Sequence, residues 1–329
     1  MDYDIIFGNA LRSAIGPEAA IYALLAIGLN VHWGYTGLLN LGQVGFMLVG
    51  AYGLAITVAT WGWSMWLGIP IGLAAAALLA LALGLPTLRL RADYFAITTI
   101  AVSEILRIVT RSSPAEDLTG GAFGLQGIAG SFYDINPIPS GEYGFGVVTF
   151  SANRLWVMLV TWALVMVCTG IVVLLTSSPW GRVLRSIRED EDAARSLGKN
   201  VIAFKMQALI VGGMIGGLAG VMFAIRASAA NAESFKSDVT FFAYVILILG
   251  GAATRLGPIV GTFIFWFVIS GVESFLRQAD GQGWLPGFLQ GSEAVGAVTL
   301  ILVGLALGLL IVFRPQGIFG NRNEIRLEA

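Results

Sequence analysis

The chain has 329 residues, of which 57% are hydrophobic and 12% charged, and its mean hydropathy is +0.81. Soluble domains carry about a quarter charged residues, so this composition excludes a soluble globular protein. The formal net charge of −1 offers no basic surface for nucleic acid, and apolar runs such as residues 67–85 lack the alternation of a membrane β-barrel. The expected fold class is all-α, a polytopic integral membrane helical bundle.

Membrane segments are predicted from apolar length, because a helix needs about 20 residues to cross about 30 Å of hydrocarbon. With glycine, proline and charge as boundaries, nine segments lie near 19–33, 36–60, 66–86, 93–111, 154–176, 203–225, 239–253, 257–277 and 290–313. The first and seventh are short enough to be half-helices. We therefore expect about 8–10 membrane segments, some broken or re-entrant, in a single transmembrane domain over residues 1–329.

Orientation is predicted from Lys and Arg, which short cytoplasmic loops retain. One side of the nine-segment arrangement holds Arg89, Arg91, Arg182, Arg185, Arg188, Arg195, Lys199, Arg255, Arg314, Arg322 and Arg326. The loop at 112–153 has no Lys or Arg and is expected to face outward, with the carboxyl terminus cytoplasmic. Arg226 and Lys236 run against the rule, and an eight-segment arrangement with the amino terminus inside also fits.

The second predicted segment is interrupted by Asn40 and Gln43 among the glycines 37, 42 and 45. Backbone freed by glycine at membrane depth must be satisfied by protein or by a water-filled cavity, so such breaks often line a substrate route. The alternative is close helix packing, with Asn40 bonding to a neighbouring helix. His32 beside Trp33 is expected to be an interfacial anchor.

The predicted segment 93–111 is unusually polar. Its candidate pathway residues are Thr98, Thr99, Ser103 and Glu104. Glu104 shares a helix face with Arg107 and Arg111, so a static ion pair between helices is the alternative to substrate contact. The same alternative holds for Glu273 and Arg277.

A turn in the outward loop contains Thr119, Gly120 and Gly121. Its exposed backbone amides are expected to bind a carboxylate or to dock a substrate-delivering protein, unless the loop closes on itself. Small residues elsewhere predict close helix packing. These are Gly212, Gly216, Gly220, Gly257 and Gly261.

Residues 181–200 form a polar interruption between two predicted segments. Apolar residues recur there at helical spacing, at Val183, Leu184, Ile187, Ala194 and Leu197, and predict one amphipathic helix. Such a helix can lie among lipid headgroups. The acidic run 189–192 suits an anionic leaflet poorly, so a protein partner is favoured.

Six stretches, in order and spacing, resemble the LivM-type permease of branched-chain amino acid ABC importers, a family of high-affinity amino acid, urea and amide uptake. They are residues 34–53, 88–107, 118–128, 185–205, 250–263 and 313–320. The fourth contains the pattern Asp, Ala, Ala, three residues, Gly. It is similar to the Glu-Ala-Ala pattern of the loop that docks into the ATPase subunit of ABC importers, with Asp in place of Glu. The resemblance implies an ATPase-coupling helix at about 181–200, with Arg185, Arg188, Glu189, Asp190, Glu191, Asp192, Ala193, Ala194 and Gly198.

The resemblance also implies a function: the transmembrane permease subunit of an ATP-driven importer that translocates branched-chain or related amino acids from a soluble binding protein. The implied partners are that binding protein, a homologous second permease, two ATP-binding cassette ATPase subunits and membrane lipid, in a bacterial inner membrane. We expect no enzyme activity, catalytic residue, metal site or cofactor on this chain. No phosphate-binding loop ending in Gly-Lys-Ser/Thr is found in the sequence, so ATP and Mg²⁺ are expected in the partner ATPases.

Two alternatives remain open. The first is a secondary transporter driven by an ion gradient, which would need a carboxylate at membrane depth such as Glu104. The second is the same type of ABC permease carrying urea or short amides.

Overall fold

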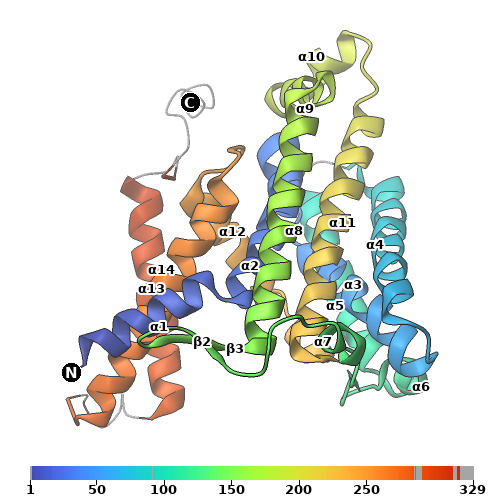
Figure 1. Cartoon of the computed structure of the whole chain (residues 1–329). Helices are drawn as coiled ribbons and strands as arrows, with labels where there is room; N and C mark the ends of the chain where they lie inside the picture. The colour runs from blue at the N-terminus through green and yellow to red at the C-terminus, as the bar shows by residue number, and fades with distance from the viewer. Residues whose placement is uncertain (1, 91, 285, 287–290, 314–316, 319–329) are drawn as a thin grey trace.

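The computed structural model describes residues 2–90, 92–284, 286, 291–313 and 317–318. The longer helices are α1 (Tyr3–Ile15), α2 (Pro17–Leu29), α3 (Gln43–Ala55), α4 (Met65–Thr87), α5 (Ala92–Arg111), α8 (Ala152–Ser177), α9 (Pro179–Glu189), α11 (Val201–Ala227), α12 (Asp238–Gly250), α13 (Gly257–Gly281) and α14 (Ser292–Phe313) (Figure 1). Short helices are α6 (Glu116–Thr119), α7 (Gly130–Asp134) and α10 (Glu191–Ser196), with 3₁₀ turns at Ser113–Ala115 and Ala232–Ser234. π-Helical turns extend α2 over Asn30–Tyr35 and α3 over Ile56–Thr60.

The fold class is confirmed as an all-α polytopic membrane bundle. Five helices in the described residues are long and apolar enough to cross a membrane, and the number is six if α1 with α2 and its π-turn, which are bent by 43° to each other, are counted as one span. Three other predicted segments form helices of a different kind. α12 has 13 residues, which span only about 20 Å, α5 carries Asp93, Glu104, Arg107 and Arg111, and α14 is apolar over the shorter stretch Glu293–Leu302. The predicted segment 36–60 begins with a non-helical stretch at residues 37–42, before α3.

The strands form two small antiparallel pairs. β1 (Leu125–Gln126) pairs with β4 (Ala229–Ala230), joining the loop after α5 to the loop after α11. β2 (Glu142–Phe145) and β3 (Val148–Ser151) form a hairpin whose tip residue Phe145 is exposed. The β2–β3 hairpin lies at the end of the bundle opposite α9 and α10 (Figure 1), and β4 directly follows the end of α11 that is farther from α10.

In the core, α11 packs closely against α2, α3 and α4, because glycines allow the helix backbones to come into contact. A Cβ added at Gly50 would lie 2.1 Å from the Gly217 carbonyl oxygen, and one at Gly220 would lie 1.8 Å from the Met47 carbonyl oxygen. Gly212 faces Gly28 and His32, and Gly216 faces Gln43 and Phe46. Gly257 faces Gly251 and Thr254, and Gly261 faces the backbone of Ile246 and Gly250. All five glycines singled out in the sequence therefore lie where a side chain would clash.

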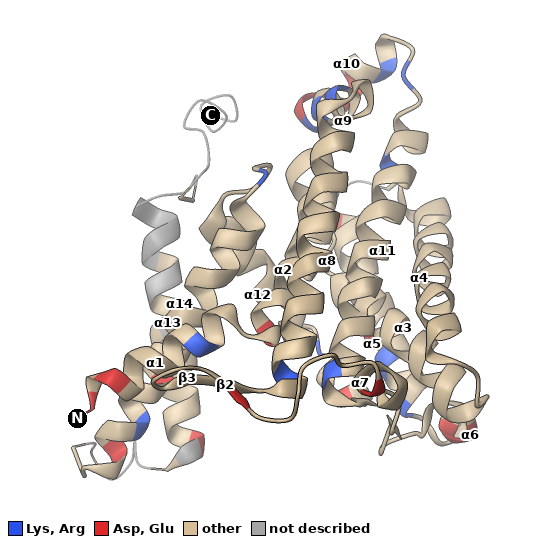
Figure 2. Ribbon diagram, in the orientation of Figure 1, with Lys and Arg blue, Asp and Glu red and all other residues tan. Residues whose placement is uncertain are grey.

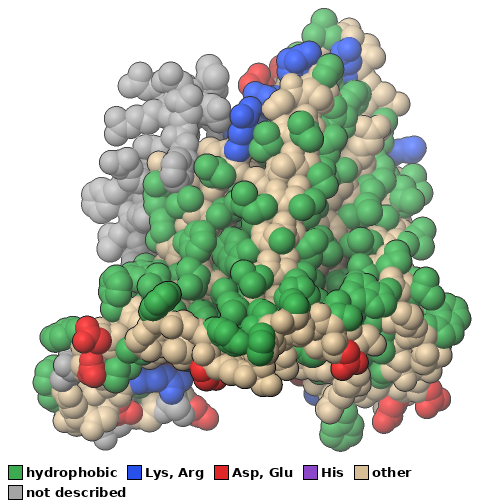
Figure 3. Space-filling view, in the orientation of Figure 1, with side chains coloured by type: hydrophobic (Ala, Val, Ile, Leu, Met, Phe, Trp, Pro, Cys, Tyr) green, Lys and Arg blue, Asp and Glu red, His purple; other side chains and the backbone are tan. Residues whose placement is uncertain are grey.

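Charged residues gather at the two ends of the bundle (Figure 2). Between those ends, the visible face is covered mainly by hydrophobic side chains (Figure 3). This is the distribution expected of a protein whose middle lies in hydrocarbon and whose ends lie in water.

Candidate functional site

The polar interruption at 181–200 forms two helices instead of one. α9 begins with Pro179 at its first turn, and the Ser178 side chain accepts a hydrogen bond from the Trp180 amide. It ends at Asp190, whose extended backbone breaks the helix and whose carboxylate accepts from the amides of Asp192 and Ala193 at 3.0 and 2.9 Å to begin α10. The prediction of one continuous helix is wrong, because an Asp with N-cap geometry starts a new helix in its middle.

The apolar stripe of this region is shorter than expected. Ile187, Ala194 and Val201 form a small buried cluster, with Val183 and Phe204 packed against it. Leu197, which was expected on the same stripe, has 78% of its surface exposed. Leu197 follows the last residue of α10, Ser196, and lies in solvent at the end of that helix, beside the exposed Gly198.

Some charged side chains of this region form ion pairs, and others are exposed to solvent. Arg195 pairs with Glu191 at 2.9 Å and with Asp192 at 3.0 Å, and Lys205 of α11 also pairs with Glu191. Glu189, Asp190 and Asp192 are exposed, as is Ala193, whereas Ala194 is buried. The α9–α10 surface, residues 179–198, therefore presents exposed groups of both signs and one leucine outward, with Arg182, Arg185 and Arg195 exposed beside the acidic residues.

Two arginines of α9 connect this surface to the membrane helices. Arg185 donates a hydrogen bond to the Thr176 carbonyl oxygen at 2.9 Å, at the end of α8. Arg188 donates to the Gly34 carbonyl oxygen at 2.7 Å, in the π-turn that precedes the non-helical segment 37–42. A cavity of about 240 Å³ lies beside Arg188 and is lined also by Thr36, Gly37, Leu38 and Thr87. α9 is thus bonded to a helix break that has open space next to it.

A buried polar network holds that break. The Asn40 side-chain amide donates to the Gln43 side-chain oxygen at 3.0 Å, and the Gln43 amide donates to the Gly212 carbonyl oxygen at 3.2 Å. His32 lies 3.0 Å from the Asn40 amide through Nδ1 and 3.1 Å from the Leu209 carbonyl oxygen through Nε2. Nε2 therefore donates to the carbonyl and Nδ1 accepts from the amide.

All three side chains of this network are fully buried. The expectation that His32 is an interfacial anchor is wrong, because the π-turn directs the ring toward α11. The network joins the segment 37–42 to α11, and it uses Asn40 and Gln43 within the protein in this conformation.

The hydroxyl groups of α5 divide between two environments. Thr99 is buried and accepts a hydrogen bond from the Leu41 amide at 3.1 Å, and buried Ser103 lies against Gly45. Thr98 bonds to its own helix, at the Tyr94 carbonyl oxygen. The structure therefore brings Thr99 and Ser103 together with the Asn40 region and leaves Thr98 apart.

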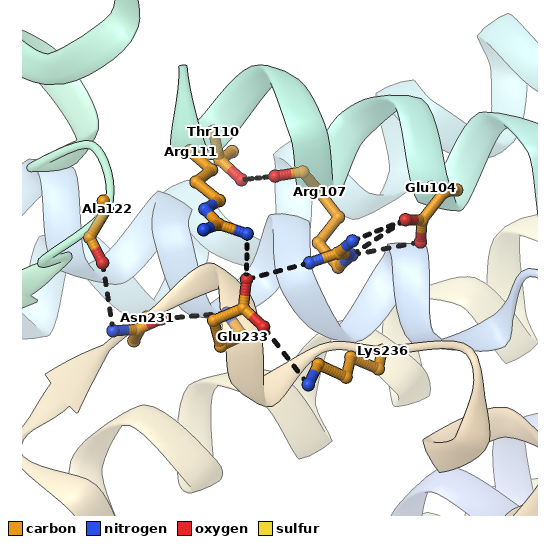
Figure 4. Close-up of polar contacts among 8 residues, drawn as sticks. All are labelled: Glu104, Arg107, Thr110, Arg111, Ala122, Asn231, Glu233 and Lys236. Atoms are coloured by element: carbon orange, nitrogen blue, oxygen red, sulfur yellow. Dashed lines mark hydrogen bonds and ion pairs between the residues drawn. The ribbon is translucent and has the colours of Figure 1, made fainter. Parts of the chain in front are cut away.

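Glu104 belongs to a second cluster, the α5 ion cluster, which consists of Glu104, Arg107, Arg111, Glu233 and Lys236 (Figure 4). Arg107 pairs with Glu104 at 2.6 Å and with Glu233 at 3.2 Å. Arg111 and Lys236 pair with Glu233 at 2.6 and 3.2 Å. The hydrogen bond from Lys236, together with the charges of Arg111 and Arg107, lowers the pKa of the Glu233 carboxyl below its ordinary value.

The turn with Thr119, Gly120 and Gly121 closes on itself. The Thr119 hydroxyl is buried, lies 2.7 Å from the Thr110 carbonyl oxygen, and accepts from the Gly121 amide at 3.3 Å. Gly120 and Gly121 have φ angles of 73° and 56°, which favour glycine. β1 and β4 then join this loop to the residues that precede Glu233.

Two further predictions concern the pair of Glu273 with Arg277 and the absence of a metal site. Glu273 and Arg277 pair at 2.6 Å on α13. Among the described residues, no three His, Cys, Asp or Glu side chains gather as metal ligands would.

Comparisons with known proteins agree with this architecture. The family described as the permease component of the branched-chain amino acid transport system matches residues 15–307. The chain is 30% identical to the high-affinity branched-chain amino acid transport permease LivM of Salmonella typhimurium, over 96% of this chain and 72% of that protein. LivM of Escherichia coli is also 30% identical, over 95% and 71%.

A more distant relative is the nucleoside ABC transporter permease NupC of Lactococcus lactis, 28% identical over 86% of this chain and 87% of that protein. The family match and the two LivM relatives each extend over most of the chain. This protein therefore belongs to the branched-chain amino acid transport permease family, whose members are membrane subunits of ABC transporters.

Proposed function

We propose that this chain is a permease subunit that imports branched-chain or related amino acids, driven by separate ATPase subunits that dock on the α9–α10 surface. The observation that carries the proposal is the hydrogen bond from Arg188 to Gly34, which links that surface to a helix break. The similarity to LivM supports the choice of substrate.

The proposed mechanism is mechanical. Closure of the ATPase subunits displaces α9, and Arg188 transmits the displacement to the π-turn at Asn30–Tyr35. The cavity beside Gly37 and Leu38 gives the segment 37–42 room to move. Because Asn40, Gln43 and His32 bond this segment to α11, its movement shifts α11 relative to α5 and opens a route past the buried polar groups.

The proposed assembly contains two ATPase subunits, a homologous second permease and a soluble binding protein, in a bacterial inner membrane with the α9–α10 end in the cytoplasm. This chain contributes no ATP or Mg²⁺ site to the mechanism. ATP hydrolysis and its Mg²⁺ belong to the partners.

The test compares Arg188 with Arg255, an arginine outside the α9–α10 surface. In the reconstituted transporter, Arg188→Ala should lower ATP-driven leucine uptake about tenfold while leaving assembly and basal ATP hydrolysis intact, because a hydrogen bond from a charged group is worth about 1.5–3 kcal/mol. Arg255→Ala, at an exposed residue that donates a hydrogen bond to the Ser177 hydroxyl outside the docking surface, should have little effect. Normal uptake by Arg188→Ala, or equal losses in both variants, would contradict the proposed route of coupling.

A charge reversal of residues 189–192 tests the docking surface itself. We expect this variant to assemble in the membrane but to lose ATP-driven uptake, because the outward-facing acidic groups no longer match the ATPase. If uptake is retained, this surface is not the docking site.

Two other functions are distinguished by the same vesicles. A secondary transporter would accumulate substrate from this chain alone under a sodium or proton gradient, without ATPase subunits; Glu104, its candidate ion ligand, is engaged with Arg107. Substrate competition separates amino acids from urea, short amides and nucleosides, the last being suggested by the similarity to NupC.

A further inference from the structure

The cavity beside Arg188, about 240 Å³ in volume, lies among α4, α5, α9, α10 and the residues that follow the π-turn. The length of α4 gives the depth of this cavity in the membrane. α4 has 23 residues and begins after Ser64 at the end of the bundle opposite α9 (Figure 1), so it spans about 35 Å. Hydrocarbon is about 30 Å thick. Thr87 and Leu88, which line the cavity, therefore lie at the level of the lipid headgroups at the α9–α10 end.

The charged side chains of the lining leave one positive charge unmatched. They are Arg188, Glu191 and Lys205. Lys205 pairs with one carboxylate oxygen of Glu191, and Arg195 pairs with the other, so Glu191 is already neutralised. Arg188 has no acidic partner among the residues that the structure describes.

The other charged groups near the cavity do not reverse this sign. Glu189 and Asp190 follow Arg188 in the chain, but both are exposed and neither lines the cavity. Arg89, exposed between the lining residues Leu88 and Leu90, adds a second positive group nearby. The cavity therefore suits an anion.

Arg188 also has hydrogen-bond donors that a ligand can reach. Its Nη1 donates to the Gly34 carbonyl oxygen. Nε and Nη2, which form the other edge of the guanidinium, bond to nothing in the described part of the chain. Neither belongs to the enclosed side-chain atoms that lack a partner, so both retain accessible surface. The bond to Gly34 thus holds the guanidinium in place and leaves one edge free.

Apolar side chains connect this charge to the lipid. Phe95 is buried in the lining, whereas Leu90, also in the lining, is 47% exposed and stands at the mouth of the cavity. Tyr94 and Ile97, in the first two turns of α5, are exposed as well. A ligand with its anion at Arg188 therefore has an apolar surface next to it on which hydrocarbon chains can lie.

We propose that this cavity binds the phosphate group of an anionic phospholipid from the adjacent leaflet. The phosphate accepts hydrogen bonds from Nε and Nη2 of Arg188, whose planar edge matches two phosphate oxygens, and the acyl chains lie along Leu90 and the exposed residues of α5. Basic pockets between membrane helices at the cytoplasmic side bind anionic headgroups in this way. The assignment to the inner leaflet rests on the proposed function and its orientation, whereas the choice of an anion with an apolar tail rests on the cavity.

The arrangement predicts a preference among lipids. Phosphatidylglycerol brings one negative charge and satisfies Arg188. Phosphatidylcholine brings the same phosphate with a quaternary ammonium group, which would add a further positive charge beside Arg188 and Lys205. A free phosphate satisfies Arg188 but leaves the apolar surface uncovered, so it should bind more weakly than the lipid.

The experiment is equilibrium binding of radiolabelled phosphatidylglycerol to the purified full chain in a non-ionic detergent, without ATPase subunits. We expect saturable binding that unlabelled phosphatidylglycerol displaces. Phosphatidylcholine and uncharged diacylglycerol with the same acyl chains should displace it at least about tenfold less well, because each lacks the net negative charge that Arg188 selects. Equal displacement by all three would overturn the proposal.

Two arginines of α9 provide the matched variants. Arg188→Gln should weaken binding at least about tenfold, since it removes a charged donor of two hydrogen bonds. Arg182→Gln, at an exposed residue of the same helix that does not line the cavity, should leave binding unchanged. Equal losses in both variants would show a general attraction to a basic surface and would exclude the cavity as the site.

Leu39→Trp separates the space in the cavity from its charge. Leu39 is half-buried in the lining, so a larger ring takes up space while Arg188 is retained. This variant should bind phosphatidylglycerol several-fold more weakly at a melting temperature close to that of the wild type. If its melting temperature falls, the comparison of Arg188→Gln with Arg182→Gln decides. Unchanged binding in both Leu39→Trp and Arg188→Gln would contradict the proposed site.

Inorganic phosphate and glycerol phosphate test the other source of the same anion. They should displace the lipid only at concentrations at least about a hundredfold higher, because they lack the apolar tail. If they displace it as well as unlabelled phosphatidylglycerol does, the ligand is a soluble phosphate compound and the lipid assignment is wrong.

The outcome for this site is separate from the outcome for the proposed function. Failure of phosphatidylglycerol to bind while ATP-driven uptake persists would sink this site but not the proposed function. Arg188-dependent lipid binding in a transporter that shows no ATP-driven uptake would do the reverse.

Discussion

Single glycines decide how closely α3 and α11 approach. At Gly220 an added Cβ would lie 1.8 Å from the Met47 carbonyl oxygen, which belongs to the backbone and cannot rotate away. At Gly170 on α8 nothing lies within 4 Å of the same position. The chain thus contains helical glycines of two kinds, and their substitution should have opposite effects.

Gly220→Ala should destabilise the protein by about 1–3 kcal/mol, because overpacking forces the two helices apart. Gly170→Ala should be neutral or stabilising by about 0.5–1 kcal/mol, since alanine loses less backbone entropy in a helix. Thermal unfolding of both variants in detergent checks this. If Gly220→Ala is as stable as the wild type, α3 and α11 are packed less tightly than described.

Glu233 should make stability depend on pH. Its pKa is lowered from an ordinary value of 4.5 by Lys236 and by the arginines of α5, so the carboxylate stabilises the fold above that value. The contribution is lost as the pH falls through the lowered pKa of the folded state. Glu233→Gln should therefore melt below the wild type at pH 6, and the difference should shrink toward pH 3. Glu142→Gln, at an exposed residue of the β2–β3 hairpin, is the control and should melt at the same temperature as the wild type at pH 6.

Some residue contacts could be predicted from the sequence and others could not. Glu104 and Arg107 are three apart on one helix, so their pairing follows from helical geometry. Glu233 is 126 positions from Arg107, and only its spacing to Lys236 hinted at a pair. The place of His32 depended on a π-turn, which no local sequence pattern announces.

Among the elements, α9 and α10 show how one residue redirects a helix. Helical spacing correctly predicted Ile187 and Ala194 as buried, yet it carried the pattern through Asp190. The capping preference of Asp was the available signal. It was outweighed by the apolar spacing, which stays continuous from Ile187 to Ala194 across the break.

Two substitutions at Asp190 distinguish the capping role of its side chain from the role of its charge. Asp190→Asn keeps a capping side chain and removes the charge, whereas Asp190→Ala loses the cap at a cost of about 1 kcal/mol. If the orientation of α10 matters for coupling, Asp190→Ala should lower ATP-driven uptake and Asp190→Asn should not. Equal losses in both variants would assign the effect to the charge instead.

For the whole molecule, composition and apolar length were enough to predict the class and most helices, because hydrocarbon imposes a length and an apolar surface. The tertiary arrangement was not predictable in this way. The pairing of β1 with β4 and the cavity beside Arg188 bring together residues from distant segments. Neither the strand pairing nor the cavity has a local signature in the sequence.

The proposed orientation can be tested with cysteines. The native Cys168 is buried and should not react with a membrane-impermeant maleimide. Leu197→Cys and Phe145→Cys place thiols at exposed positions at opposite ends of the bundle, with 78% and 94% exposure of the native side chains. In intact cells, with the outer membrane made permeable where one is present, only Phe145→Cys should be labelled. In inside-out vesicles only Leu197→Cys should react, and the reverse pattern would invert the topology.

The close glycine contacts between α3 and α11 have a mechanical consequence. Where two backbones touch without intervening side chains, no deformable layer lies between the helices, so the two helices move as one rigid unit. Under the proposed mechanism, any change of shape in the transport cycle must then occur at the ends of that unit, where the non-helical residues 37–42 precede α3.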